Sequence, residues 1–279
     1  MKKACVIGWP VSHSRSPIIH NYWLRKHGIA GSYTRQAVQP EELPEFMTTL
    51  ADRGYEGCNV TIPHKETAFK LVSIADEATQ RLGVVNTIYH RDGQLLGTST
   101  DGEGFMANLR ASAPAYAAKN DRVMVLGAGG AAMAIVGALL DQGAAEVAVA
   151  NRTQERSVAL RKQFGQRVIP VEWSGRSSKL KECGLLVNST ALGMTAQPEL
   201  DIDLSNLAAS AVVCDIVYTP LESKLLLDAK RRGNVTVGGL GMLLYQAVRG
   251  FELWFGVRPE VTQELYQLVA NDVSARERR

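Results

Sequence analysis

The chain alternates short apolar runs with amphipathic stretches along most of its length. In the first part, strand-like runs occur at residues 4–7, 32–38, 58–62, 84–89 and 94–97. Helical spacing follows the first three runs, from Pro17 to about His27, from Pro40 to Gly54 and from His64 to about Ala75. Because parallel strands need crossover connections, this alternation predicts a mostly parallel sheet with helices on its faces. The turn signal at 91–93 predicts that the last two runs form a hairpin at the edge of that sheet.

A second alternating pattern begins near Asp121, after an Ala-rich segment at 111–119. Strands are expected at 123–126, 147–150, 168–171, 184–188, 212–216 and 235–237. A final helix is expected over 240–255, where apolar residues form a stripe that must pack on another surface. The pattern predicts an α/β fold of two domains with a boundary near 104–119, and the length of 279 residues agrees with two domains.

Composition and charge exclude several classes of protein. The 31 Lys and Arg against 28 Asp and Glu leave a net charge of +3, which is too small to indicate a nucleic-acid or membrane partner. The four cysteines show no CxxC spacing and the five histidines no metal-ligand spacing, so we expect no metal site, no disulfide framework and a reducing cytoplasm. The charge-free stretch 123–140 approaches the length of a membrane span, but its glycines divide it into a strand and a short helix.

The strongest local motif lies at the start of the second pattern. Gly127, Ala128, Gly129, Gly130, Ala131 and Ala132 form the G-x-G-x-x-A dinucleotide fingerprint, between a strand and a helix. Gly127 permits the tight turn, Gly129 lets the backbone approach a pyrophosphate, and Ala132 permits close packing of helix on strand. The alternative is a glycine-rich turn without a ligand, but the βαβ unit around this turn is complete.

The end of the next strand bears on the choice between NAD and NADP. An NAD enzyme usually carries Asp or Glu here, to bind the ribose 2′-hydroxyl. This chain has Asn151, Arg152, Thr153 and then Arg156, and two guanidinium groups with a hydroxyl suit a 2′-phosphate. We therefore expect NADP, and the alternative is that both arginines belong to a solvated helix start.

Candidate ligand-binding and catalytic residues occur in the first part of the chain. Ser14 and Ser16 alternate in an extended loop and so project to one side, although Ser16 before Pro17 also suits a helix cap. In NVTIPHK, Asn59 and Thr61 share a strand face and Lys65 comes just past the strand end, where α/β sheets bind ligands. An amide and a carboxylate that could converge there follow in Asn86 and Asp101.

The chain resembles the shikimate dehydrogenase family through the ordered motifs SRS, NVTIPHK, VNT, TDGEG, GAGGA, NRTQER, DIVY and GLGMLLYQ. The resemblance implies a Rossmann-type NADP-binding domain over 105–241 and a smaller α/β substrate-binding domain over 1–104, completed by C-terminal helices at 242–279. It also implies an NADP-dependent oxidoreductase acting on a CH–OH group, which interconverts 3-dehydroshikimate and shikimate in aromatic amino-acid (chorismate) biosynthesis.

The resemblance implies a role for each matching residue. Lys65 and Asp101 are the catalytic pair, and Ser14 and Ser16 bind the substrate carboxylate. The residues that bind the ring hydroxyls are Asn59, Thr61, Asn86, Asp101 and Gln246. Tyr218 is a further contact of the substrate. The nicotinamide end of the cofactor site is lined by Glu77, Ile216 and Gly239.

Three departures from the family pattern, at Ser99, Met133 and Ser223, remove no catalytic group but leave open a quinate/shikimate dehydrogenase paralogue that uses NAD or NADP. A separate alternative from another function class is a non-catalytic ligand sensor of the same fold. Retention of Lys65 and Asp101 argues against the sensor. The expected partner is a small-molecule substrate, with no nucleic acid or membrane, and the protein is expected to be a monomer or homodimer.

Residue chemistry defines what the pair would do. Oxidising a secondary alcohol needs a base at the hydroxyl, and Lys65 can act as that base only when it is neutral. A charged Asp101 nearby favours the protonated amine instead. We therefore interpret Asp101 primarily as an orienting group and hydroxyl partner, and protonated Lys65 as the acid in the reductive direction.

Overall fold

The computed structural model describes residues 1–277, which divide into two compact units. The first unit comprises Met1–Asp101 and Leu243–Val269. The second comprises Gly102–Met242 and the described chain from Ala270 onward. The expected layout placed the whole of 242–279 with the first domain, whereas here the helical segment from Ala270 onward groups with the second unit.

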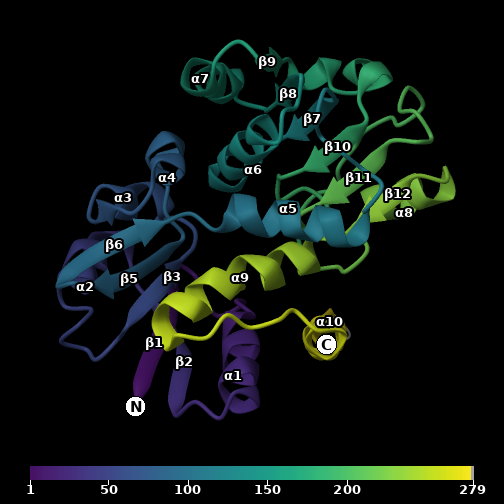
Figure 1. Ribbon diagram of the computed structural model, residues 1–279. Coiled ribbons are helices and arrows are strands. Elements are labelled where there is room, and N and C mark those ends of the chain that lie inside the picture. The colour runs from purple at the N-terminus through teal and green to yellow at the C-terminus, as the bar shows by residue number, and fades with distance from the viewer. Residues whose placement is uncertain (278–279) are drawn as a thin grey trace. The chain divides into compact units, whose positions relative to one another are not determined.

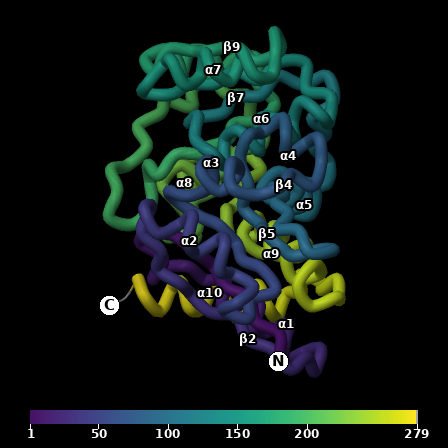
Figure 2. Tube along the Cα trace, turned by 90° about the vertical axis from the view of Figure 1, so that its left-hand side faces the viewer, coloured from purple at the N-terminus to yellow at the C-terminus, as the bar shows by residue number. Residues whose placement is uncertain are grey.

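A six-stranded mixed sheet forms the centre of the first unit; Figure 1 labels all of its strands except β4, which Figure 2 labels. The strands are β1 (Lys2–Gly8), β2 (Gly31–Ala37), β3 (Gly57–Val60), β4 (Ser73–Ile74), β5 (Thr87–Arg91) and β6 (Gln94–Thr98), in the order β2-β1-β3-β5-β6-β4. The sheet is parallel across β2, β1 and β3 and antiparallel from β3 through β5 to β6. The predicted hairpin of β5 and β6 is confirmed, with its turn at Asp92 and Gly93 in left-handed conformations. Its predicted place at the sheet edge is wrong, because β4 pairs outside β6.

The first helix of this unit agrees with its predicted bounds, whereas the second and third are shorter than the sequence spacing predicts. They are α1 (Ser16–Lys26), the 3₁₀ turn η1 (Pro40–Glu42), α2 (Leu43–Thr48), α3 (Lys65–Phe69) and α4 (Glu77–Leu82). The predicted helix over 64–75 is wrong beyond Phe69, since Ser73 and Ile74 pair with β6 and the Ala75 amide donates to the Gly97 carbonyl at 3.0 Å. Sheet pairing here outweighs local helical propensity.

The helix α9 (Gly239–Phe255) supplies an aromatic cluster to the first unit. Phe251 and Trp254 are buried beside Trp23 and His20 of α1, with ring centroids 5.4–6.0 Å apart in the three closest pairings across the two helices. The indole of Trp254 also donates to the Ile88 carbonyl at 2.8 Å, which attaches α9 to β5. Both elements are labelled in Figure 2. The predicted apolar stripe therefore packs, in this part, against α1 and the sheet.

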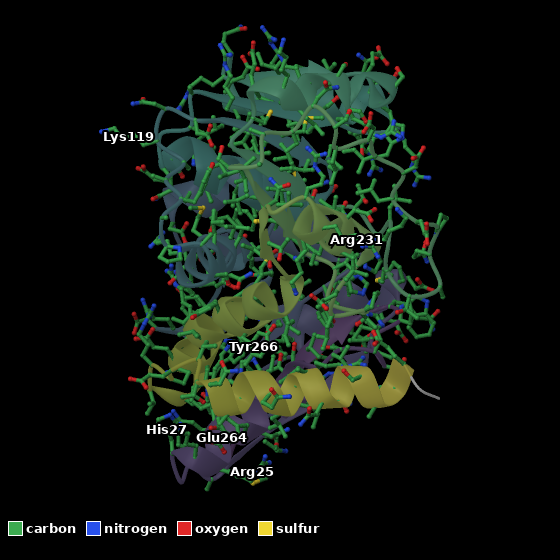
Figure 3. All side chains as sticks on the ribbon, turned by 90° about the vertical axis from the view of Figure 1, so that its right-hand side faces the viewer. Arg25, His27, Lys119, Arg231, Glu264 and Tyr266 are labelled. Carbon is green, nitrogen blue, oxygen red and sulfur yellow. The ribbon has the colours of Figure 1, made fainter. Side chains whose placement is uncertain are left out.

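A second contact attaches the C-terminal segment to α1. The Tyr22 hydroxyl donates to Glu264 Oε2 at 2.9 Å, at the beginning of α10 (Gln263–Glu277), where Figure 3 labels Glu264. The Trp23 indole donates to the Glu260 carbonyl at 3.0 Å, just before this helix. Both donors come from α1, so residues 260–264 are fixed to the first unit by side-chain hydrogen bonds.

The second unit contains a six-stranded parallel sheet. Its strands are β7 (Arg122–Leu126), β8 (Glu146–Ala150), β9 (Val168–Val171), β10 (Leu185–Asn188), β11 (Val212–Asp215) and β12 (Val235–Val237), in the order β12-β11-β10-β7-β8-β9. This is the doubly wound dinucleotide-binding order. The helices are α5 (Asp101–Ser112), α6 (Gly130–Asp141), α7 (Gln154–Phe164), α8 (Lys224–Arg231) and the short 3₁₀ turns η2 (Trp173–Gly175) and η3 (Ser178–Glu182).

Alternate residues of these strands face two separate cores. Val123 and Val125 belong to one apolar cluster, and Met124 and Leu126 belong to the other, as expected for a sheet covered on both faces. The charge-free stretch is divided between β7 and α6, as the glycines predict. Within residues 1–277, no helix has the length and apolar character that crossing a membrane requires.

Candidate active site

The predicted catalytic pair is in direct contact. Lys65 is the first residue of α3 and Asp101 the first of α5, and the Lys65 ammonium donates to Asp101 Oδ2. The two side chains are 18% and 9% exposed. A turn closed by the His64 amide and the Thr61 carbonyl (2.9 Å) places the lysine just beyond the carboxyl end of β3, while the N-terminus of a helix favours the carboxylate.

Asn86 occupies the centre of the polar network around this pair. Its Nδ2 lies within hydrogen-bond distance of three acceptors: Asp101 Oδ1 at 2.8 Å, Thr100 Oγ1 at 3.0 Å and Gln246 Oε1 at 3.3 Å. Its Oδ1 accepts from the Thr100 amide at 2.8 Å and from the Thr87 hydroxyl at 3.1 Å. Both amide hydrogens are thus used within the protein, so Asn86 acts on Asp101 directly.

Gln246 comes to the same place from the far end of the sequence. The Thr100 hydroxyl donates to the Gln246 carbonyl at 2.8 Å, which fixes this turn of α9 against the start of α5. The Gln246 amide nitrogen donates one hydrogen to the Leu243 carbonyl at 3.0 Å, leaving its second hydrogen available for a ligand. Four predicted residues, Lys65, Asn86, Asp101 and Gln246, therefore form one connected cluster in the first unit.

Asn59 lies next to this cluster but has a different set of partners. It is buried on β3, where its Nδ2 donates to the Asn86 carbonyl and to Thr87 Oγ1, each at 3.1 Å. Its Oδ1 accepts from the Tyr33 hydroxyl at 2.6 Å. Thr61, which was predicted to share its face, lies half-buried beyond the end of β3, and its amide donates to the Ile7 carbonyl at 2.9 Å.

Ser14 and Ser16 are also close together. The Ser14 hydroxyl donates to Ser16 Oγ at 3.2 Å, and both residues are buried. The helix-cap interpretation of Ser16 is wrong, because α1 has Arg15 as its N-cap residue and no side-chain cap. The Arg35 guanidinium donates to the Ser14 carbonyl through Nε (2.9 Å) and Nη2 (2.5 Å), which holds the loop in place.

Positive charge surrounds this serine loop. Burial and the charges of Arg15 and Arg35 lower the pKa of His13. Burial disfavours charge of either sign, but the two arginine charges disfavour a further cation and favour an anion. Two hydroxyls in such an environment can bind a carboxylate.

The glycine turn of the second unit has the geometry of a phosphate-binding loop. Gly127 has φ +105°, and a Cβ there would lie 2.7 Å from Ser189 Oγ, so only glycine fits. Gly129 is exposed and is the N-cap residue of α6, and a Cβ there would meet nothing within 4 Å. Ala128 is buried, Gly130 and Ala131 begin α6, and Ala132 packs into the core. The open side of Gly129 thus leaves room for a ligand at the helix N-terminus.

The residues after β8, which the sequence assigns to a 2′-phosphate, lie on the surface at the start of α7. Arg152, Thr153 and Arg156 are exposed in the loop and in the first turn of α7. Asn151 Nδ2 donates to the Thr153 carbonyl at 2.8 Å and so fixes the loop. No carboxylate occupies 151–153, the place that would bind a ribose 2′-hydroxyl.

Ile216 and Gly239 are brought together at the carboxyl end of the second sheet. A Cβ on Gly239 would lie 2.1 Å from the Ile216 carbonyl oxygen, so α9 can begin here only with glycine. Tyr218 follows two residues after Ile216 and is half-buried. Tyr218 therefore belongs to the second unit, whereas the other predicted substrate residues belong to the first.

Asp215 organises this segment, a role the sequence did not predict. Its carboxylate accepts from the Val217 amide and Asn188 Nδ2, each at 3.0 Å, and from the Ser223 hydroxyl at 2.5 Å. Burial raises the pKa of Asp215 to about 6. Ser223, one of the departures from the family pattern, keeps this hydrogen bond and also caps α8 by accepting from the Leu226 amide at 3.5 Å. The DIVY motif containing Asp215 was the available signal.

Glu77 is exposed in the first turn of α4, in the first unit, so its expected role beside the nicotinamide stays a prediction. Of the other two departures, Ser99 donates its amide to Thr79 Oγ1 at 3.0 Å, and Met133 packs against the core from α6. Across residues 1–277, no group of three or more His, Cys, Asp or Glu side chains is placed to hold a metal ion.

Three family profiles match the chain. The profile of the shikimate dehydrogenase substrate binding domain matches residues 6–88, that of shikimate / quinate 5-dehydrogenase matches 110–216, and that of the shikimate 5′-dehydrogenase C-terminal domain matches 239–263. A curated relative from Rhodopseudomonas palustris strain TIE-1, named shikimate dehydrogenase (NADP(+)), is 55% identical over 274 residues, covering 98% of both chains. A relative of the same name from Azorhizobium caulinodans is 51% identical and covers 99% of this chain and 98% of its own.

Solved structures agree with these matches. Shikimate 5-dehydrogenase from Thermus thermophilus in complex with NADP(H) and shikimate has a TM-score of 0.86 at 34% identity, covering 98% of this chain and 100% of that one. Quinate dehydrogenase from Corynebacterium glutamicum in complex with NAD has a TM-score of 0.88 at 29% identity, covering 97% and 99%. The profiles together span more than half of the chain, and the curated relatives span nearly all of it. The chain belongs to the shikimate dehydrogenase family.

Proposed function

We propose that the protein is an NADP-dependent shikimate dehydrogenase that reversibly reduces 3-dehydroshikimate to shikimate in the biosynthesis of chorismate and the aromatic amino acids. The observation that carries the proposal is the Lys65–Asp101 pair, which is largely buried and is surrounded by Asn86 and Gln246. A secondary alcohol and its ketone need one group that moves a proton and several that recognise hydroxyls, and this cluster supplies both.

Proton transfer falls to Lys65 in this proposal. In the reductive direction, the Lys65 ammonium donates a proton to the oxygen of the carbonyl as charge develops on it. In the oxidative direction, the neutral amine accepts the proton from the hydroxyl. Asp101 holds the Lys65 Nζ on one carboxylate oxygen, and Asn86 holds the other oxygen, which keeps the pair in one geometry. NADPH supplies the hydride to the carbonyl carbon when it is bound.

The remaining polar residues of the first unit would bind the acid substrate. Ser14 and Ser16 would bind the carboxylate, in the electropositive loop held by Arg35. Asn59, Thr61 and Gln246 would bind ring hydroxyls, and Tyr218 of the second unit would contact the substrate. On this basis the first unit corresponds to the expected substrate-binding domain and the second to the expected cofactor domain.

Cofactor binding rests on the second unit. The open backbone at Gly129 and the N-terminus of α6 favour a pyrophosphate, and Arg152 and Arg156 favour a 2′-phosphate over a free 2′-hydroxyl. The relatives named above are NADP(+) enzymes by name, which agrees with this preference. Glu77, Ile216 and Gly239 are the proposed nicotinamide neighbours.

The test is an absorbance assay at the reduced-nicotinamide band, crossing shikimate and quinate with NADP and NAD. The proposal expects turnover of shikimate with NADP well above the other three mixtures. Preferred turnover of quinate or NAD would identify a quinate/shikimate paralogue, the activity of the Corynebacterium structure by its name. Turnover in none of the mixtures would favour a ligand sensor.

The cellular setting is part of the same proposal. All four cysteines are free and buried, which suits a reducing compartment, and we place the enzyme in the cytoplasm. The partner proposed is the small-molecule substrate, with neither nucleic acid nor membrane, and the assembly is a monomer or homodimer. Size-exclusion chromatography with light scattering distinguishes these two assemblies.

A further inference from the structure

Tyr33 is a buried residue of β2 whose hydroxyl reaches the proposed substrate site. The side chain is 2% exposed, and its hydroxyl donates to Asn59 Oδ1 at 2.6 Å. Burial raises the pKa of Tyr33 far above its usual value, so the phenol keeps its proton and remains a donor. Tyr33 does not belong to any of the motifs that identify the family here.

The hydrogen bonds that Asn59 makes within the protein leave it one acceptor position for a ligand. A carboxamide has two N–H donors and an oxygen with two lone pairs. Both hydrogens of Asn59 are directed to protein acceptors, the Asn86 carbonyl and Thr87 Oγ1, and Tyr33 uses one lone pair of Oδ1. A ligand at Asn59 can therefore only donate a hydrogen bond to the second lone pair of this oxygen.

A rigid aromatic wall holds Tyr33 in this position. The His20 imidazole stacks on the Tyr33 ring with centroids 4.1 Å apart and planes 13° from parallel, and Trp254 packs beside both. The ring nitrogens of His20 make no hydrogen bond of normal geometry among the described residues, although His20 lies near enough to Asn59 for the amide to favour its protonated form, so its support for Tyr33 comes mainly from packing. Rotation of the phenol away from Asn59 would require this cluster to repack.

We propose that Tyr33 is a positioning residue that fixes Asn59 as a hydrogen-bond acceptor and thereby makes the site select a ring hydroxyl at this point of the substrate. A keto or ether oxygen there would face a buried oxygen with no hydrogen between them. The inference rests on the proposed function, since it assigns one contact of the polyol acid substrate. It adds a residue and a direction of hydrogen bonding that the motifs do not contain.

The free-energy cost of an unsatisfied hydrogen-bonding group at Asn59 gives the expected change in affinity for the substrate. Leaving a buried hydrogen-bonding group unsatisfied costs about 1–3 kcal/mol, which corresponds to roughly a 5- to 150-fold change in affinity. Tyr33→Phe removes the hydroxyl but keeps the ring against His20. Asn59 then keeps its two N–H bonds but loses the donor that holds its Oδ1, so this oxygen is held less firmly toward the ligand.

The experiment compares Tyr33→Phe with wild type by isothermal titration calorimetry of shikimate and its three analogues that each lack one ring hydroxyl. Tyr22→Phe is the matched control, because it deletes a phenol hydroxyl that bonds to Glu264 and touches none of the proposed substrate residues. We expect Tyr33→Phe to weaken shikimate about tenfold and to weaken two analogues equally. The third analogue lacks the hydroxyl that faces Asn59, and Tyr33→Phe should bind it as tightly as wild type does. The affinity for NADP should be the same in both proteins.

The same penalty on all three analogues, or none on shikimate, would overturn the proposal, because a general structural effect does not depend on one hydroxyl. If Tyr33→Phe fails to fold, Thr87→Val removes an acceptor of Asn59 instead, but Thr87 also donates to Asn86, so Asn86→Ala is titrated beside it. A penalty on one hydroxyl in Thr87→Val that is absent from Asn86→Ala supports the proposal, and the same pattern in both variants overturns it. Failure of the proposed function is distinguishable, since wild type itself would then bind neither shikimate nor its analogues.

Discussion

Asn86 and Asp101 form a 2.8 Å hydrogen bond between the Asn86 amide and the carboxylate oxygen that Lys65 does not use. The carboxylate is therefore held from two sides, by a cation and by a neutral donor. Asn86 in turn is held through its own oxygen by the Thr100 amide at 2.8 Å. The orientation of the proposed catalytic pair thus depends on backbone atoms, which move little.

Asn86→Ala should lower kcat about 10- to 100-fold, because it leaves one oxygen of Asp101 without a donor and the pair free to rotate. Steady-state kinetics and urea unfolding would be measured together. Asn234→Ala is the control, since Asn234 is also buried and donates to the Ala208 and Ala211 carbonyls in the second unit. Both variants should lose stability, and only the first should lose kcat; equal kcat for both would contradict the role of Asn86.

Lys65→Ala should lower kcat by roughly 10²–10⁴, the usual contribution of general acid–base catalysis. Its affinity for NADP should remain near wild type, because the proposed cofactor contacts other than Glu77 lie in the second unit. Kinetics with shikimate and fluorescence titration with NADPH would separate these quantities. Lys70→Ala, which removes an exposed lysine at the end of the same helix, should leave both unchanged. Near-normal turnover of Lys65→Ala would exclude the lysine as the acid and base.

Arg152→Asp should weaken NADP far more than NAD, since it replaces a cation expected at the 2′-phosphate by an anion. A loss of at least about tenfold in kcat/KM for NADP is expected, with NAD changed only slightly. Lys162→Asp makes the same charge reversal at the far end of α7 and should alter neither. If NADP and NAD lost affinity equally in Arg152→Asp, the assignment of this loop to the 2′-phosphate would fail.

His20 should make the protein sensitive to acid. Burial lowers the pKa of His20 from 6.5 to about 3, so the folded state binds this proton less readily than the unfolded state does. The stability contribution is therefore fully present above pH 6.5 and is lost as pH falls from 6.5 toward 3, by about 5 kcal/mol in all. His20→Phe keeps an aromatic ring and should flatten this dependence, measured by urea unfolding between pH 4 and 7. An unchanged pH dependence would assign the acid sensitivity to other groups.

Asp215 should have the opposite effect. Burial raises its pKa from 3.8 to about 6, so the folded state holds this proton more tightly than the unfolded state. Its contribution to stability is present below about pH 4 and falls as pH rises through 6, by about 3 kcal/mol. Asp215→Asn should remove this decline and should also raise KM for substrate if the 216–223 segment presents Tyr218. The free energy of unfolding of the variant and of wild type would be measured at pH 5 and at pH 8. If the difference between the two proteins were the same at both pH values, Asp215 would not be the group that titrates.

Local signals in the sequence predicted the strands of the second unit and its glycine turn, but not the helices α5 and α8. Short continuous runs of apolar residues predict the parallel strands, because a strand that is buried on both faces carries apolar side chains at almost every position. The fingerprint predicts the turn at Gly127, since only glycine adopts its positive φ against Ser189. Lys65 and Asp101 were also predicted, from motifs rather than from any local physical property of a lysine or an aspartate.

Only the tertiary structure decided the partners of these residues. No sequence spacing predicts that β4 pairs outside β6, because two residues suffice for the pairing and helical spacing continues through them. Likewise Tyr33, Thr100 and Asp215 have ordinary local patterns, and their importance arises from hydrogen bonds to residues distant in the chain. Local propensity and motifs are properties of neighbouring residues, whereas burial and hydrogen-bond satisfaction depend on the folded environment, which the linear pattern does not contain.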